Sequence, residues 1–290
     1  MINNYSKIYI SITNKLRCDK VYKNDAPTHT DSVKPVLLCP IDKTAYIRNE
    51  LFKNYFLCFQ ILASNFPICK LNPKELPECF AKAVEDTLKI LKNPVPELGL
   101  PSIDPIEVES LQFQGGSGNI VLNQNLKNVK IFNMPSTKVT KAEINIEGYE
   151  FNNVLHTFVP EMKFTANCEL IGKILLLPIR GNGNLDLNIY NLTAVISMRG
   201  GQVEKKKITY LKIDNTTCAL TPGLVKIRFD NLFNGEKTLG DNMNKVLNDN
   251  WKEVFSEFKA AYEEVLAQYV HNLAGQVFNK VPLKDLFPGP

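Results

Sequence analysis

One segment near the end of the chain restricts the fold more than any other. Between residues 241 and 280 the apolar residues recur with a period of 3.6, which is typical of an amphipathic helix. With Asp241 as its N-cap, this helix would extend about 55–60 Å. Its apolar face covers about half of the circumference, so a large apolar surface has to cover it. A single coiled-coil strand is the alternative, but the face does not follow a heptad repeat.

The middle of the chain alternates between apolar and polar residues, which predicts strands with one buried face and one solvated face. Ala142, Ile144 and Ile146 alternate in this way, and so do the residues of 225–229. We expect roughly seven or eight antiparallel strands between residues 106 and 230. A one-sided sheet and a one-sided helix each lack a cover, and each can cover the other.

Three local features of this region carry further predictions. The alternation changes phase between 185–189 and 192–196, which indicates a β-bulge. The glycine-containing segments 180–184 and 199–202 are interpreted as turns between neighbouring strands. The three lysines at 205–207 are interpreted as a solvated loop rather than a phosphate site.

A shorter helix is expected near the start of the globular part, at 78–92, where apolar residues are spaced by three and four. Pro77 stands near its start, a position that proline favours. Cys69 and Cys79 bracket the loop before this helix, and we expect them to form a disulfide. A metal site there is disfavoured, because no histidine or second cysteine pair lies close in the sequence.

The N-terminal part resembles a targeting region. Residues 51–65 contain a lysine, a run of about nine mostly apolar residues and then small residues, which is the pattern of a secretory signal. A buried strand or helical turn at 55–63 is the alternative. Residues 1–50 are interpreted as a non-native or disordered extension, with a real uncleaved anchor as a further alternative, and 66–290 as the folded domain.

Cleavage near Asn65 would leave four of the seven cysteines, an even number that is expected of an oxidised secreted protein. Asn191 and Asn215 begin glycosylation sequons, which agree with secretion.

The charge distribution argues against nucleic-acid binding. Residues 67–290 contain 25 Lys or Arg and 25 Asp or Glu, and phosphate binding requires clustered cations. No apolar run approaches the roughly 18 residues of a membrane span, so stable membrane insertion is not expected. The histidines at 29, 156 and 271 lack catalytic partners in the sequence, and His271 is expected on the solvated side of the long helix. We therefore expect no enzyme activity, no cofactor and no metal.

Four blocks of sequence resemble a known family. They are CFAKAVEDTLKILKNPVPELGLPSIDPIEVESLQF, GKILLLPIRGNGNLDL, DNLFNGEKTLGDNMNKVLNDNW and FNKVPLKDLFP, and they occur in the order found in the takeout and juvenile-hormone-binding proteins of insects. The resemblance covers about 66–290 and is stronger to the takeout branch. It implies an α+β fold of the tubular, super-roll type, in which a strongly curved antiparallel β-sheet wraps the long C-terminal helix. It also implies secretion and an elongated apolar tunnel for one lipophilic ligand.

The chain departs from this family in its cysteines. Juvenile-hormone carriers have a second disulfide between a strand and the long helix, but no cysteine follows Cys218 here. Cys218 could instead pair with Cys168, and the sequence leaves this open. The departure places juvenile hormone itself in doubt as the ligand.

Large side chains on the buried faces are the candidate ligand contacts, although each of them alone is equally consistent with core packing. The candidates are Phe132, Phe158, Phe164, Trp251, Phe255, Phe258, Tyr262 and Tyr269. The hydroxyl of Tyr262 or Tyr269 would hold a ligand head group.

The leading hypothesis is a monomeric secreted carrier of a terpenoid, fatty acid or semiochemical. The alternatives are an extracellular signalling protein with a structural lipid, and a membrane-active lipid-transfer module.

Overall fold

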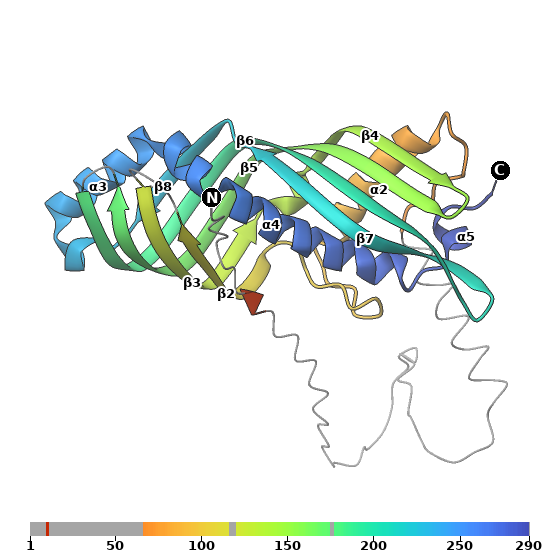
Figure 1. Cartoon of the computed structure of the whole chain (residues 1–290), viewed down its shortest axis with the longest axis horizontal. Coiled ribbons are helices and arrows are strands. Elements are labelled where there is room, and N and C mark those ends of the chain that lie inside the picture. The colour runs from red at the N-terminus through yellow and green to blue at the C-terminus, as the bar shows by residue number, and fades with distance from the viewer. Residues whose placement is uncertain (1–9, 12–65, 116–119, 175–176, 290) are drawn as a thin grey trace, which may run out of the picture.

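The computed structural model describes residues 10–11, 66–115, 120–174 and 177–289. The signal-like segment 51–65 and almost all of the extension 1–50 lie outside these residues. The body is elongated, and the long helix α4 runs lengthwise along a curved antiparallel sheet (Figure 1). Helices α2 and α5 lie at one end of the body, and α3 lies at the other (Figure 1). This is the predicted α+β arrangement.

The elements follow one another in a simple order. The strands are β1 (Ile10–Ser11), β2 (Ile106–Gly115), β3 (Ile120–Phe132), β4 (Lys138–Glu147), β5 (Glu150–Ile174), β6 (Leu177–Lys205), β7 (Ile208–Thr221) and β8 (Leu224–Phe229). The helices are α2 (Leu76–Ile90), α3 (Lys237–Asp249), α4 (Trp251–Phe278) and α5 (Leu283–Leu286), with 3-10 turns at Met134–Ser136 and Phe233–Gly235. Seven strands therefore lie between residues 106 and 229, as the alternation predicted.

Two long central strands connect the two ends of the body. β5 has 25 residues and β6 has 29, and they pair with each other along almost their whole length. β5 pairs on its other side with β4 through its first half and with β3 through its second half. β6 pairs with β8 near its start and with β7 near its end. Each central strand thus changes its outer partner midway, which divides the tube into two halves on one continuous sheet.

The predicted phase change occurs between these halves, but it is not a bulge in one strand. Val159 pairs with Leu192, and Glu161 pairs with Tyr190, so the register of β5 on β6 is continuous. The residues between these pairs are Pro160, which has no N–H to donate, and Asn191, whose φ is 52°. On β5, the odd-numbered residues before Pro160 face the cavity, and the even-numbered residues after it do so. The inward face of β6 changes from odd- to even-numbered residues beside Asn191, at the same level of the sheet.

The prediction of turns at 180–184 and 199–202 was wrong, because both segments lie inside β6. Their glycines allow close backbone approach instead. A Cβ atom on Gly200 would lie 1.9 Å from the Lys212 carbonyl oxygen, and one on Gly183 would lie 2.2 Å from the Asp230 carbonyl oxygen. The β6–β7 connection is formed by Lys206 and Lys207, both with positive φ, within the lysine run predicted to be a loop.

The long C-terminal helix is interrupted, which corrects the prediction of a single helix starting at Asp241. α3 begins four residues earlier, and its N-cap Glu236 accepts hydrogen bonds from the Thr238 and Leu239 N–H groups. The helical conformation breaks at Asn250 (φ −114°, ψ 27°), whose side chain donates to the Val246 carbonyl. α4 then continues for 28 residues, about 42 Å.

Asparagine side chains of α3 form hydrogen bonds with the backbone N–H and C=O groups on the outer edge of β8. Asn244 accepts from the Phe229 N–H and donates to the Phe229 carbonyl, both at 2.9 Å. Asn248 does the same with Ile227, at 2.9 and 2.6 Å. Four residues of helix rise about 6 Å and two residues of strand about 6.6 Å, so i, i+4 on α3 matches i, i+2 on β8. We call these four bonds the asparagine clasp.

The outer edge of β7 is bonded to α4 in a related way. The Glu263 carboxylate accepts from the Leu220 N–H at 2.7 Å. The His271 ring contacts the Thr216 hydroxyl at 3.1 Å, so this histidine is half-buried and not solvated as predicted. These bonds leave fewer free backbone groups at the edge, where a strand of another molecule would otherwise pair.

The disulfide between Cys69 and Cys79 forms as predicted and holds the segment before α2. The Cys69 and Leu71 N–H groups donate to the carbonyls of Leu286 and Pro288, so this segment and the C-terminal residues bind each other. α2 begins two residues earlier than predicted, with Pro77 in its first turn. Its Glu85 carboxylate accepts from the Val139 N–H at 2.8 Å and thereby attaches α2 to β4.

Candidate ligand-binding cavity

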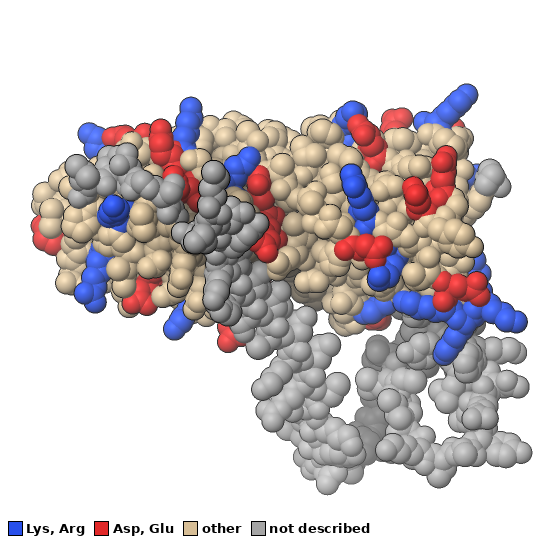
Figure 2. Space-filling view, viewed as in Figure 1, with Lys and Arg blue, Asp and Glu red and all other residues tan. Residues whose placement is uncertain are grey.

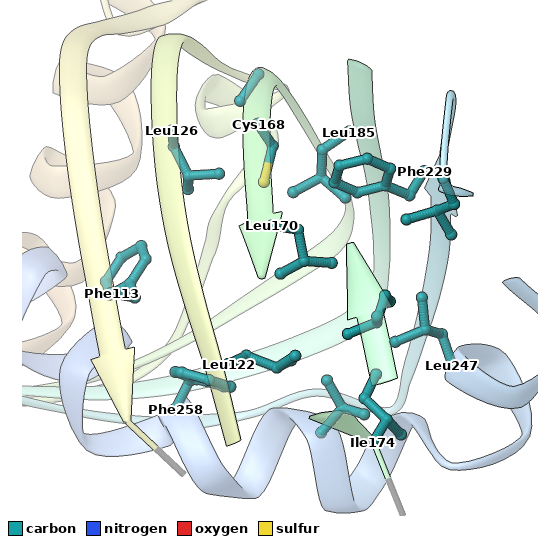
Figure 3. Packing of buried hydrophobic residues seen from close by; sticks show 14 of the residues in the cluster. Phe113, Leu122, Leu126, Cys168, Leu170, Ile174, Leu185, Phe229, Leu247 and Phe258 are labelled. Atoms are coloured by element: carbon teal, nitrogen blue, oxygen red, sulfur yellow. The ribbon is translucent and has the colours of Figure 1, made fainter. Parts of the chain in front are cut away.

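An apolar cavity of about 420 Å³ lies between the concave face of the sheet and helices α2 and α4. Its lining comes from strands of both halves of the tube, so it extends along the body rather than lying at one end. In the half near α3, side chains of β2, β3, β5 and β8 point towards one another and towards α4 (Figure 3). Phe113, Leu126, Cys168 and Phe229 are among them.

The lining is almost entirely uncharged hydrocarbon. Of the described residues that border the cavity, none is Lys, Arg, His, Asp or Glu. The polar ones are few, and they are Thr87, Gln124, Thr137, Thr157, Tyr262 and Tyr269, besides the Trp251 indole and the sulfur atoms. An apolar molecule in the cavity would therefore exchange water for hydrocarbon contacts without displacing an ion pair.

Five of the eight aromatic residues predicted from the sequence border this cavity. They are Phe164, Trp251, Phe255, Tyr262 and Tyr269. On β5 the inward positions at this level are Thr157 and Val159, so Phe158 between them is directed to the opposite face. Phe132 follows the inward-facing Ile131 and is likewise outside the lining.

Phe258 is the third predicted contact that does not border the cavity. Its side chain is buried, and its ring lies 6.0 Å from the ring of Tyr262. Phe258 therefore supports the wall of the cavity from behind. Phe132, Phe158 and Phe258 thus lie outside the lining, and ligand contact by the other five stays a prediction.

Tyr262 stands at the centre of an aromatic cluster that also includes Phe113 and Phe255. The Phe113 ring meets it edge to face at a centroid distance of 5.1 Å, and the Phe255 ring lies at 5.7 Å. The Tyr262 hydroxyl hydrogen-bonds the Gln124 side chain, and burial raises the Tyr262 pKa to about 12. Sequence reasoning missed Gln124, although its position between Leu122 and Leu126 marks a polar residue on a buried face.

Tyr269 lies two helical turns further along α4, on the same side of the helix. Its hydroxyl oxygen is buried and has no hydrogen-bond partner. Burial raises the pKa of Tyr269 to about 12, so the hydroxyl keeps its proton at neutral pH. A buried hydroxyl without a partner is uncommon in folded proteins.

The two remaining cysteines of the domain are free thiols, which excludes a bridge between Cys168 and Cys218 in this structure. Cys168 borders the cavity from β5, whereas Cys218 lies on β7 and outside the lining. Burial raises the pKa of each thiol to about 12, so both are poor nucleophiles at neutral pH. Within the described residues, His, Cys, Asp and Glu form no group suited to hold a metal ion.

The outer surface carries charges of both signs. On the face that Figure 2 shows, acidic and basic side chains are scattered among one another. The predicted glycosylation residues Asn191 and Asn215 lie exposed on β6 and β7. No helix in the described part of the chain is long and apolar enough to cross a membrane.

Comparison with known proteins agrees with this architecture. Residues 52–288 match the model of the haemolymph juvenile hormone binding protein family. The circadian clock-controlled protein daywake of Drosophila melanogaster is 22% identical over 228 residues, which cover 76% of this chain and 85% of that protein. Daywake of Drosophila yakuba is 20% identical over 229 residues, with the same two coverages.

The fold resembles a solved member of the takeout group. The crystal structure of Epiphyas postvittana Takeout 1 matches with a TM-score of 0.69 and 22% identity, over 76% of this chain and 99% of that one. The resemblance first noted in four blocks of sequence is thus confirmed along the whole folded domain. The chain belongs to the haemolymph juvenile hormone binding protein family.

Proposed function

We propose that this protein is a carrier that holds one small hydrophobic molecule in the cavity along α4 and performs no chemistry on it. The observation that carries the proposal is the apolar, uncharged cavity of about 420 Å³. Its volume falls in the range of about 300–1,000 Å³ that is usual for small-molecule sites. The family is named for a hormone-binding protein of haemolymph, which is the same class of function.

The driving force would be transfer of ligand hydrocarbon out of water. At about 25 cal/mol per Å², burial of about 400 Å² of ligand surface contributes about 10 kcal/mol before the costs of association. Lost motion of the ligand reduces this to an affinity in the micromolar or submicromolar range. The aromatic rings of Trp251, Phe255 and Tyr262 would contact the ligand from α4, and Phe164 would contact it from β5.

The carrier would act outside the cell. The disulfide between Cys69 and Cys79 is typical of an oxidising compartment. The segment 51–65 has the pattern of a cleavable signal, and removal of residues 1–65 would leave the domain that begins just before Cys69. We propose that the mature protein is this domain and that it is a monomer.

Native mass spectrometry of the protein secreted from insect cells tests the proposal. A carrier should show one bound lipid per chain, and an added apolar ligand should replace this lipid within the time of the experiment. A bound lipid that never exchanges would support a structural ligand in a signalling protein instead. Transfer of lipid only on contact with vesicles would support a membrane-active transfer module. A chain that carries no lipid and takes none up would refute the carrier function.

A further inference from the structure

The outer face of the sheet carries two glycosylation sequons and, between them, a group of apolar side chains that do not reach the cavity. We propose that Asn191 and Asn215 carry N-linked glycans and that these glycans cover the apolar group. The inference concerns the outer face of the sheet rather than the cavity. It rests on the extracellular location that is part of the proposed function.

Both acceptor side chains are accessible in the folded domain. Asn191 and Asn215 are exposed, and so are the sequon threonines Thr193 and Thr217. Within the part of the chain that the structure describes, neither acceptor amide takes part in a hydrogen bond. The backbone carbonyl of Asn191 accepts from the Gly223 N–H at 3.2 Å, which holds the backbone there and leaves the side chain free. A glycan on either asparagine would therefore displace no contact of the fold.

The apolar group occupies outward positions on the three strands β5, β6 and β7. We call it the outer patch, and its members are Val154, Phe158, Val195 and Ala219. Ala219 is exposed and the other three are half-buried. Val195 pairs directly with Ala219, so the patch is continuous from one strand to the next. Contiguous apolar side chains on a surface favour association with other molecules.

The two sequons bracket the outer patch along β6. Thr193 of the first sequon pairs with Phe158, so Asn191 lies about 7 Å along the strand from the position beside this ring. Asn215 pairs with Arg199, which stands about 27 Å from Asn191 along β6. Glycans are bulky and strongly hydrated, so one at each end would keep other protein chains away from the apolar side chains between them.

Attachment of each glycan is a transfer of a sugar to an amide nitrogen. The donor is an oligosaccharide linked to a lipid diphosphate, and the acceptor motif is the Asn-X-Thr triplet. A bond forms between the asparagine Nδ2 atom and C1 of the first sugar, the bond from C1 to the diphosphate oxygen breaks, the lipid diphosphate leaves, and the amide nitrogen loses one proton. In the folded domain the Thr193 hydroxyl donates to the Thr221 carbonyl at 3.2 Å, a bond that forms after the transfer.

The test uses the full chain expressed in insect cells, with the protein collected from the medium. Peptide N-glycosidase in heavy-oxygen water converts a glycosylated asparagine into labelled aspartate, and mass spectrometry of the peptides locates the label. We expect the label at Asn191 and at Asn215. Asn145 is the internal control, because it is exposed on β4 but has no Ser or Thr two residues later, and it should stay unlabelled.

Two variants remove the acceptors one at a time, Asn191→Asp and Asn215→Gln. Aspartate is chosen at position 191 because the φ of 52° there favours Asn or Asp over other residues with a side chain. Each variant should lose the mass of one glycan, and the double variant the mass of both. The double variant should lose its monomer in light scattering as its concentration rises, and the further change Phe158→Thr should restore the monomer. Thermal unfolding verifies that all variants are folded.

Three outcomes would overturn the inference. A secreted chain without label at Asn191 and Asn215 would show that the glycans are absent. A double variant that stays monomeric would show that the glycans do not cover an associating surface. Self-association that persists after Phe158→Thr would place the associating surface outside the outer patch. A chain that is retained in the cell would instead contradict the extracellular carrier function, which is a result different from a secreted chain without glycans.

Discussion

The asparagine clasp between α3 and β8 allows a prediction of stability that follows directly from geometry. Replacing Asn248 by Ala removes the partners of the Ile227 N–H and carbonyl groups, which are bonded at 2.9 and 2.6 Å. No strand pairs with this edge of β8 among the described residues, so another part of the protein cannot replace the lost bonds. The two backbone groups then depend on whatever water reaches them between the helix and the sheet.

The magnitude can be estimated from the number of groups left without partners. Each half-buried backbone group left without a partner costs about 1 kcal/mol, so Asn248→Ala should lower the free energy of unfolding by about 2 kcal/mol. For a domain of this size the midpoint temperature should fall by about 4–8 °C. Asn244→Ala removes the equivalent pair of bonds to Phe229 and should cost a similar amount.

Urea denaturation followed by circular dichroism measures these changes, and the same helix offers a control. Asn242 is exposed and makes no bond to β8, so Asn242→Ala should be neutral or slightly stabilising, because alanine favours the helix. Similar stabilities for Asn242→Ala, Asn244→Ala and Asn248→Ala would refute the clasp as a stabilising contact. Since Ile227 and Phe229 border the cavity, the two clasp variants should also release a bound probe faster.

Three further predictions concern the cavity and the sheet. Ala194→Phe places a ring in the cavity and should weaken binding of an apolar dye about 10-fold, because about two methylenes of the dye would no longer be buried. Ala219→Phe lies on the outer face of β7 and should leave the affinity unchanged. Titration of both variants with the dye tests this difference. The free energy of unfolding should fall as the pH rises from 10 to 12, because the pKa of a tyrosine is near 10 in the unfolded chain and about 12 for folded Tyr262 and Tyr269. Urea unfolding at pH 9 and pH 11 measures this fall, which should be smaller in Tyr262→Phe and Tyr269→Phe. Gly200→Ala should lower the midpoint of thermal unfolding by several degrees, since the added Cβ would lie 1.9 Å from the Lys212 carbonyl oxygen, and an unchanged midpoint would contradict the close approach.

The sequence predicted the large elements because their signals are periodic and long. The 3.6 period of the C-terminal segment predicted the helical region, and the alternation at 142–146 and 225–229 predicted strands. The packing of the helix against the apolar face of the sheet was also predicted correctly. The interruption at Asn250 was not predictable from the period, because the apolar face continues through it. The glycines of β6 were misread, because a turn and a close backbone crossing both require glycine and differ only in tertiary structure.

The cavity lining was only partly predictable, since it depends on which face of a strand is inward. Around Phe158 both faces of β5 carry apolar residues, so the direction of this ring depends on the phase change at Pro160. Gln124 was visible as a polar residue among buried leucines, but its partner Tyr262 is 138 positions away in the sequence. That the Tyr269 hydroxyl has no partner is a property of its surroundings and has no sequence signal.

The shared change of face at Pro160 and Asn191 has an evolutionary consequence. Loss of one residue near Pro160 would turn every later side chain of β5 inside out, so that Phe164 and Cys168 would face the solvent. A matching loss beside Asn191 would restore the pairing of β5 with β6 and return the apolar side chains of both strands to the same face. Genes that descend from a common ancestor with this one should therefore gain or lose codons at these two places together, or at neither.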